Sequence, residues 1–149
     1  MAEIVAGTRQ LSDRIQQLLK LVDGKDLVDC LMAGGMVVER RMKENITKQN
    51  LIDTGNLRAS VSAEPEGTGA VTIGPRNVIY AAIHEFGGVI RAVKAKALRF
   101  RTEDGAWHTV KAVTIPARPY ARPALDEHMP EVEDAIAAAI NKKIGAITG

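Results

Sequence analysis

The sequence predicts an α+β fold with two N-terminal helices, a small, mainly antiparallel sheet of about four strands in two hairpins, and a C-terminal helix. Apolar residues recur at helical spacing up to about residue 47, and their period changes to two after residue 55. Helical spacing returns after residue 130. A length of 149 residues fits a single domain over 1–149, with residues 25–144 as the expected core and 8–22 as a candidate peripheral helix.

The first two helices are predicted from apolar stripes. Residues 8–22 place an apolar side chain on one face at Leu11, Ile15, Leu18 and Val22. After Asp23-Gly24, a second stripe runs through residues 25–47 and includes Leu27, Leu31, Gly35, Val38 and Met42. A glycine costs about 1 kcal/mol relative to alanine inside a helix. The pair Gly34-Gly35 therefore predicts the close packing of another backbone, and Cys30 on the same helix is expected to be a buried, unreactive thiol.

The middle of the chain predicts two hairpins. Apolar and polar residues alternate over residues 57–63, and residues 70–74 return after a turn at 64–69. The second hairpin joins residues 98–102 to a strand over 107–115 through a turn at 103–106. Residues 79–86 are expected to form a helical turn that ends at Gly87-Gly88, and residues 87–98 are expected to be a loop.

The last helix is predicted from both its prolines and its apolar stripe. Pro119 and Pro123 flank its start, and Pro130 is expected to kink or restart it because proline lacks an amide donor. Beyond that point the apolar stripe consists of Val132, Ile136, Ile140 and Ile144.

Composition narrows the class of protein. The chain is 46% apolar and 26% charged, as in ordinary globular proteins, and its net charge of +2 does not by itself indicate nucleic-acid binding. Cys30 is the only cysteine, which excludes an internal disulfide and suits a reducing cytoplasm. No apolar run approaches the roughly 18–20 residues of a membrane span, and the N-terminus lacks the pattern of a secretory signal. We expect no membrane partner.

The sequence gives no catalytic signature. His84-Glu85 lacks a second histidine four residues later, where Gly88 stands, so the zinc-protease pattern fails. Asp53-Thr54-Gly55 matches the aspartic-protease tripeptide but has no second copy, and it suits a turn. We therefore expect no enzyme, metal or cofactor. Glu85 is expected to make a hydrogen bond or an ion pair at a corner, with Phe86 packed inward.

A basic segment covers residues 91–101 without an acidic residue among them. Residues 51–118 carry nine Lys/Arg against six Asp/Glu, whereas residues 119–149 carry three against five. The basic segment admits three interpretations: a solvated face, contact with an acidic surface of a neighbouring subunit or partner, and nonspecific contact with DNA phosphates. Its candidate contact residues are Arg91, Lys94, Lys96, Arg99 and Arg101.

Five short motifs, in order, resemble the virion morphogenesis proteins of tailed bacteriophages over about residues 30–140. They begin with the turn and strand at 53–60 and Val71-Thr-Ile-Gly74, continue with Tyr80–Gly88 and 94–100, and end with Ile115–Tyr120 followed by Arg122–Leu125. The motif residues to which the resemblance assigns a structural role are Asp53, Thr54, Gly55, Leu57, Arg58, Tyr80, His84, Glu85, Phe86, Gly87, Gly88, Pro116, Arg118 and Pro119.

The resemblance implies a structural bacteriophage or prophage protein that acts in tail completion or head–tail joining. Such a protein would assemble as a homo-oligomeric ring at the neck and contact head-connector or tail-tube proteins. It would reside in the host bacterial cytoplasm during assembly and then in the virion. We expect the 87–98 segment and the first helix to be contact elements, and the 116–123 corner to be a rigid frame in which Arg118 pairs with Glu85 or Asp53. The alternatives are a nucleic-acid-contacting protein that uses residues 91–101 and a small hydrolase around His84, Glu85 and His108.

Overall fold

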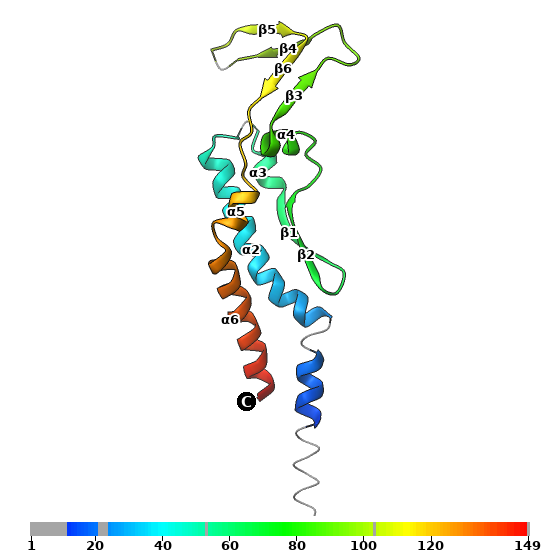
Figure 1. The fold of residues 1–149 in the computed structure, drawn as a ribbon, viewed down its shortest axis with the longest axis vertical. Coiled ribbons are helices and arrows are strands. Elements are labelled where there is room, and N and C mark those ends of the chain that lie inside the picture. The colour runs from blue at the N-terminus through cyan, green and yellow to red at the C-terminus, as the bar shows by residue number, and fades with distance from the viewer. Residues whose placement is uncertain (1–11, 21–23, 53, 103, 149) are drawn as a thin grey trace, which may run out of the picture.

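The computed structural model describes residues 12–20, 24–52, 54–102 and 104–148, and it confirms the α+β class. Residues 12–20 form a helix. The elements that follow are α2 (Lys25–Lys48), α3 (Asn56–Ser60), β1 (Val61–Glu66), β2 (Ala70–Pro75), α4 (Ala81–Phe86), β3 (Gly88–Arg91), β4 (Leu98–Arg101), β5 (Trp107–Val110), β6 (Ala112–Ile115), α5 (Arg122–Asp126) and α6 (Met129–Thr148). They form an elongated molecule whose lower part is built around α2 and whose upper part is a slender projection of strands (Figure 1).

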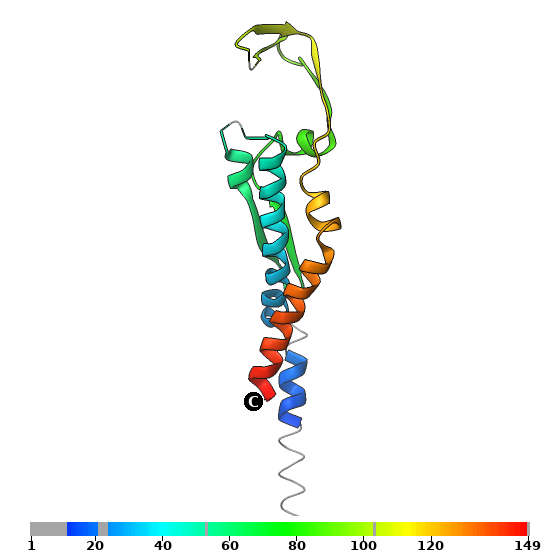
Figure 2. The same cartoon turned by 90° about the vertical axis from the view of Figure 1, so that its left-hand side faces the viewer.

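The lower part, here called the body, has α2 between two partners. The β1–β2 hairpin covers one side of α2 and α6 covers the other (Figure 2). A Cβ built on Gly34 would lie 2.7 Å from Cγ1 of Ile136 in α6, and one on Gly35 would lie 3.0 Å from Cγ1 of Val71 in β2. The two glycines therefore admit close neighbours on both sides of α2, although those neighbours are side chains and not the backbone that the sequence predicted.

Among the described residues, the hydrophobic core lies in the body and at its upper end. Its buried residues are Val38, Met42, Ile46, Leu57, Val61, Ala81, Tyr120, Ala124 and Val132. Cys30 is also fully buried in α2, as predicted. With so few aromatic residues, the core depends on branched aliphatic side chains and on a single buried tyrosine.

Ion pairs also join α2 to α6. Glu131 of α6 lies against both Arg40 and Arg41 of α2, and Lys143 pairs with Asp26 and Asp29. The hydrogen bond from Arg41 lowers the pKa of the Glu131 carboxyl group despite an opposing effect of desolvation. Exposed pairs of this kind contribute little to stability because solvent screens them, so they align the two helices more than they hold them together.

In the described part of the chain, the strands form three separate two-stranded ribbons and not one four-stranded sheet. The first hairpin, β1–β2, agrees with the prediction except at its start, because residues 57–60 lie in α3 and not in a strand. Leu57 and Val61 are four residues apart, so one helical turn also places both in the core. The alternation of apolar residues over 57–63 was therefore compatible with either conformation.

The second hairpin is more elaborate than predicted. Residues 107–115 form two strands, β5 and β6, which are separated at Lys111. β5 pairs with β4, whereas β6 pairs with β3, so residues 88–91 form a strand where the sequence predicted a loop. Gly88 lies opposite Ile115 in the β3–β6 register, and a pairing between residues so distant along the chain leaves no local turn signal.

Residues 88–115, here called the arm, rise from the upper end of the body (Figure 1). None of the described arm residues, 88–102 and 104–115, is buried. An isolated two-stranded ribbon is at best marginally stable in water. Since none of its described residues is buried, the arm adds nothing to the core that those residues could stabilise.

The two ends of the chain differ in how they pack. Pro123 lies in the first turn of α5 and Pro130 near the start of α6, so the predicted restart of the helix is confirmed. The helix at residues 12–20 extends beyond the lower end of α2, and all its residues are exposed (Figure 1). Within the described ranges, no helix combines the length and the apolar character that a membrane crossing requires.

The glycine at the α2–α6 contact gives a test of the body. Gly34→Val adds side-chain atoms where Ile136 and Val132 already lie within 3.0 Å of a Cβ, so we expect the free energy of unfolding to fall by about 1–3 kcal/mol. The matched control is Gly145→Val in α6, where nothing lies within 4 Å of a Cβ. Denaturant unfolding measures both variants, and equal stabilities would contradict the close packing of α2 on α6.

Candidate functional site

The predicted motif residues gather where the arm leaves the body. The chain enters the arm through α4 and Gly87, and it returns through residues 116–120 beside α4 (Figure 1). The amide of Arg118 donates to the carbonyl of His84 over 2.7 Å. Gly87 has a φ of 69°, and a Cβ there would lie 2.7 Å from the backbone nitrogen of Ala117. Only glycine allows the outgoing and returning segments to approach this closely.

Glu85 joins α4 to the start of α5. Its carboxylate accepts hydrogen bonds from the backbone amides of Tyr120 at 2.7 Å, Ala121 at 2.9 Å and Arg122 at 3.1 Å. Amides before a helix lack partners within the helix, and a carboxylate is the favoured acceptor for them. The prediction that Glu85 makes a hydrogen bond at a corner is therefore confirmed.

Arg118 was predicted to pair with Glu85 or with Asp53, and the pairing with Glu85 was wrong. Among the described residues no ion pair joins the two side chains, because both oxygens of Glu85 face the amides of residues 120–122. The other predicted partner of Arg118, Asp53, lies outside the described residues.

Tyr120 connects the returning segment to α2 and α4 from within the core. Its hydroxyl donates to the carbonyl of Ala81 at 3.2 Å, its amide binds Glu85, and its carbonyl accepts from Nδ2 of Asn45 at 3.1 Å. The side chain is 2% exposed. Burial, with a further contribution from the nearby Glu85 charge, raises the pKa of Tyr120 to about 12. Gln49, the residue that follows α2, donates to the adjacent Pro119 carbonyl. The C-terminal end of α2 therefore binds the returning segment at two consecutive carbonyls.

A cleft of about 660 Å³ lies beside this corner. Residues from the turn at 54–57, from α4 and its flanking Tyr80, from the returning segment and from the arm line it. The motif residues that it brings together are Thr54, Gly55, Leu57, Tyr80, His84 and Arg118. Of the predicted basic contact residues, Arg101 lines the cleft, whereas Arg91, Lys94, Lys96 and Arg99 do not.

The electrostatics of the cleft favour binding an anion over acid–base chemistry. Burial lowers the pKa of the His84 imidazole, and the charge of Arg118 lowers it further, so both effects favour the neutral form of the ring. The ring of Tyr80 contacts His84 edge to face, with centroids 5.7 Å apart. The described lining contains two guanidinium groups and no carboxylate that would orient the imidazole. No group of three or more potential metal ligands occurs among the described residues.

Some predicted residues lie elsewhere than expected. Phe86 is 72% exposed, so the prediction that it packs inward was wrong. It is the last residue of the short helix α4, and the chain leaves α4 immediately through Gly87. Arg58, Pro116 and Pro119 are exposed as well. Asn45 and Gln49 were missed, because polar residues near the end of a long helix give no sign in the sequence that they bind a distant carbonyl.

The model of the phage virion morphogenesis family matches residues 33–143. The chain belongs to the phage virion morphogenesis family. The match extends from within α2 to within α6 and so includes the corner, the cleft and the whole arm, but not the helix at residues 12–20. Comparison with curated proteins and with solved structures finds no significant match. Membership of the family indicates a structural phage virion protein and is consistent with a role other than catalysis.

Removal of the Glu85 carboxylate tests the corner. Glu85→Ala leaves the amides of residues 120–122 without their acceptor, and we expect a loss of about 2–3 kcal/mol because hydrogen bonds to charged groups are stronger than neutral ones. Glu85→Gln keeps one acceptor oxygen and should lose less. Glu127→Ala, at an exposed position after α5, is the control. Denaturant unfolding measures the free energy of unfolding of each variant. If all three variants are as stable as the unmodified protein, this role of Glu85 is contradicted.

Alkaline unfolding tests the burial of Tyr120. The pKa of this side chain rises from 10.0 to about 12 on folding, so the folded protein keeps a proton that the unfolded chain releases. Stability should therefore fall as the pH rises from 10 towards 12. Tyr120→Phe is less stable at neutral pH by about 1 kcal/mol, since it loses one hydrogen bond, but its stability should fall less steeply over that range. Identical slopes, measured by unfolding at several pH values, would exclude this role of Tyr120.

Proposed function

We propose that this protein acts in tail completion or head–tail joining, as a ring of identical copies at the neck or at the end of the tail. The observation that carries the proposal is the arm, which has no buried residue among those described although it contains four strands. A segment built in this way can bury its apolar side chains only against another molecule. In a family of virion morphogenesis proteins, neighbouring subunits and adjoining virion proteins are the natural candidates.

The surface of the arm has the properties of an assembly element. Its two ribbons are separate sheets of two strands, so the strands retain free edges that can add a further strand. Val93 is 90% exposed and Trp107 is 60% exposed. Apolar side chains that gather on one projection favour association with another protein.

A second unpartnered element lies at the opposite end of the molecule. In the helix at residues 12–20, the apolar residues Ile15, Leu18 and Leu19 are all exposed. The arm and this helix are separated along the long axis (Figure 1). Different contact surfaces at different ends permit heterologous association, which closes into a ring when the rotation between subunits allows it.

Contact with DNA is the second candidate function, and the charge of the arm favours it. Arg99 lies over the ring of Trp107, with 4.7 Å between the guanidinium carbon and the ring centroid. The other basic residues of the segment are exposed and available to phosphates. Such binding would weaken steeply between low and moderate salt, because it depends on the release of counterions.

Deletion of the gene in its phage or prophage tests the proposal, with electron microscopy of the particles as the measurement. We expect separate filled heads and tails if the protein joins the two, or tails of abnormal length if it completes the tail. A plasmid that carries the unmodified gene should restore infectious particles. Normal infectious particles from the deletion mutant would overturn the proposal.

A variant that lacks the arm shows whether the arm carries the role. Because Gly88 lies opposite Ile115, residues 89–114 can be replaced by a short glycine linker without disturbing the core. We expect this variant to unfold cooperatively like the complete protein but to fail to restore particles. Full restoration by the armless variant would show that assembly does not depend on the arm.

A further inference from the structure

We propose that the arm of one copy docks on the outer face of α5 and the first turns of α6 of the next copy. The inference rests on the proposed function, since it specifies the contact between subunits of the ring. Two surfaces of the chain carry it, and they match each other both in apolar character and in charge.

The first surface is an apolar groove in the arm of about 330 Å³. Ile90 and Val113 lie directly opposite each other in the β3–β6 ribbon, and Ile115 lies on the same face. Leu98 and Phe100 of β4 form the other wall. No described arm residue is buried, so this groove is an apolar interior that its own chain leaves open.

The rim of this groove is basic. Arg99 lines the groove itself, and Arg91, Lys94 and Lys96 are exposed on the strand and loop beside it. Within the described part of the chain, none of these cations has an acidic partner. A partner that fills the groove should therefore present apolar side chains surrounded by carboxylates.

The second surface has that composition. Leu125 of α5 and Met129 of α6 are each 39% exposed. The carboxylates beside them are exposed and have no ion pair among the described residues; they belong to Asp126, Glu127, Glu133 and Asp134. The nearby Glu131 is instead committed to Arg40 and Arg41. The four exposed carboxylates can therefore pair with cations of another molecule, whereas Glu131 is already paired within its own chain.

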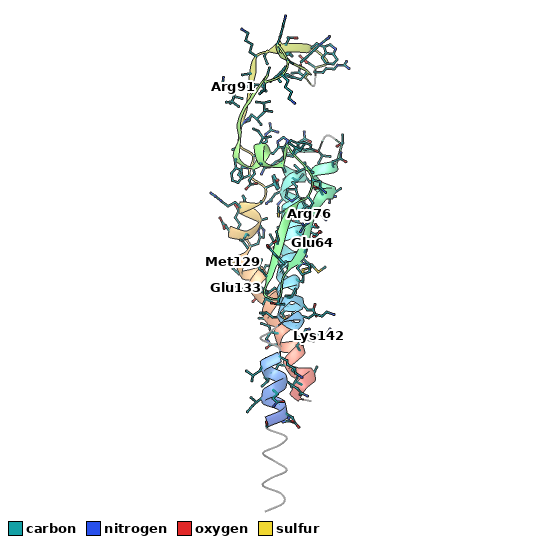
Figure 3. The ribbon with its side chains drawn as sticks, turned by 90° about the vertical axis from the view of Figure 1, so that its right-hand side faces the viewer. Glu64, Arg76, Arg91, Met129, Glu133 and Lys142 are labelled. Carbon is teal, nitrogen blue, oxygen red and sulfur yellow. The ribbon has the colours of Figure 1, made fainter. Side chains whose placement is uncertain are left out.

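The two surfaces of a single chain are far apart. Figure 3 shows Arg91 on the arm near one end of the molecule, and Met129 and Glu133 well below it on the body. The match therefore points to a second copy. Contact between different surfaces of identical chains is heterologous, and repeated around an axis it builds a ring. DNA would account for the basic rim but for neither the apolar groove nor the acidic face.

A charge exchange tests the contact by complementation of the gene deletion. Arg91→Glu with Lys94→Glu reverses the arm, and Glu133→Lys with Asp134→Lys reverses the face. Each reversal alone places like charges opposite each other, and we expect it to lower the yield of infectious particles about tenfold or more. The protein that carries all four substitutions should recover most of that loss, because opposite charges face each other again.

Controls separate this effect from a loss of fold or a general effect of charge. Lys142→Glu changes an exposed charge on α6 lower on the body (Figure 3) and should leave the yield unchanged. The melting temperature of every variant shows that the body is intact. As a second measurement, purified particles that carry both Lys94→Cys and Glu133→Cys are treated with a mild thiol oxidant. They should then give disulfide-linked multimers, and particles with either single variant should not. The native Cys30 is fully buried and does not interfere.

The outcomes distinguish the contact from the role in assembly. If the deletion mutant makes normal particles, the proposed function fails. If the deletion abolishes particles but the four substitutions together are no better than either pair, and no linked multimers form, the contact is overturned while the proposed function stands. If the arm reversal alone is harmful and also abolishes salt-sensitive DNA binding, the arm contacts DNA and the contact between subunits is overturned.

Discussion

The structure depends on one carboxylate and the backbone it holds. Glu85 lies two residues before Gly87, where the chain departs for the arm, and it binds the amides of residues 120–122, where the chain has returned. Both ends of the arm are therefore fixed to each other and, through Tyr120 and Asn45, to α2. A ribbon without a core can hold a defined position only if its base is held in this way.

The body and the arm differ in how much of their apolar surface is buried within the single chain. Among the described residues, the fully buried apolar side chains lie in the body and at the corner. Apolar burial, worth about 25 cal/mol for each Å² of surface, therefore stabilises mainly the body. The apolar residues of the arm, such as Ile90 and Val93, keep their exposed area until a partner covers it. In the proposed ring, that area drives the association of copies and not the folding of the single chain.

The sequence predicted those parts whose signals are local. The stripes of α2 and α6, the hairpin β1–β2 and the restart at Pro130 follow from periodicity and from proline chemistry. The β3–β6 ribbon did not follow, because its partners are joined by a long excursion of the chain and each strand has only four residues. The motif residues were identified through the resemblance. What Glu85 binds and where Phe86 points depend on tertiary contacts that no spacing encodes.

The motif residues serve mainly to fix the course of the backbone at the corner. Gly87 admits the returning strand, Glu85 binds amides, and Gly55, with a φ of 78°, begins α3. The pKa of His84 is lowered by burial, and its ring contacts Tyr80 rather than a carboxylate. None of these tasks selects a partner. The exposed side chains of the arm and of the α5–α6 face take no part in these backbone contacts, so chains that share the corner can differ on those surfaces.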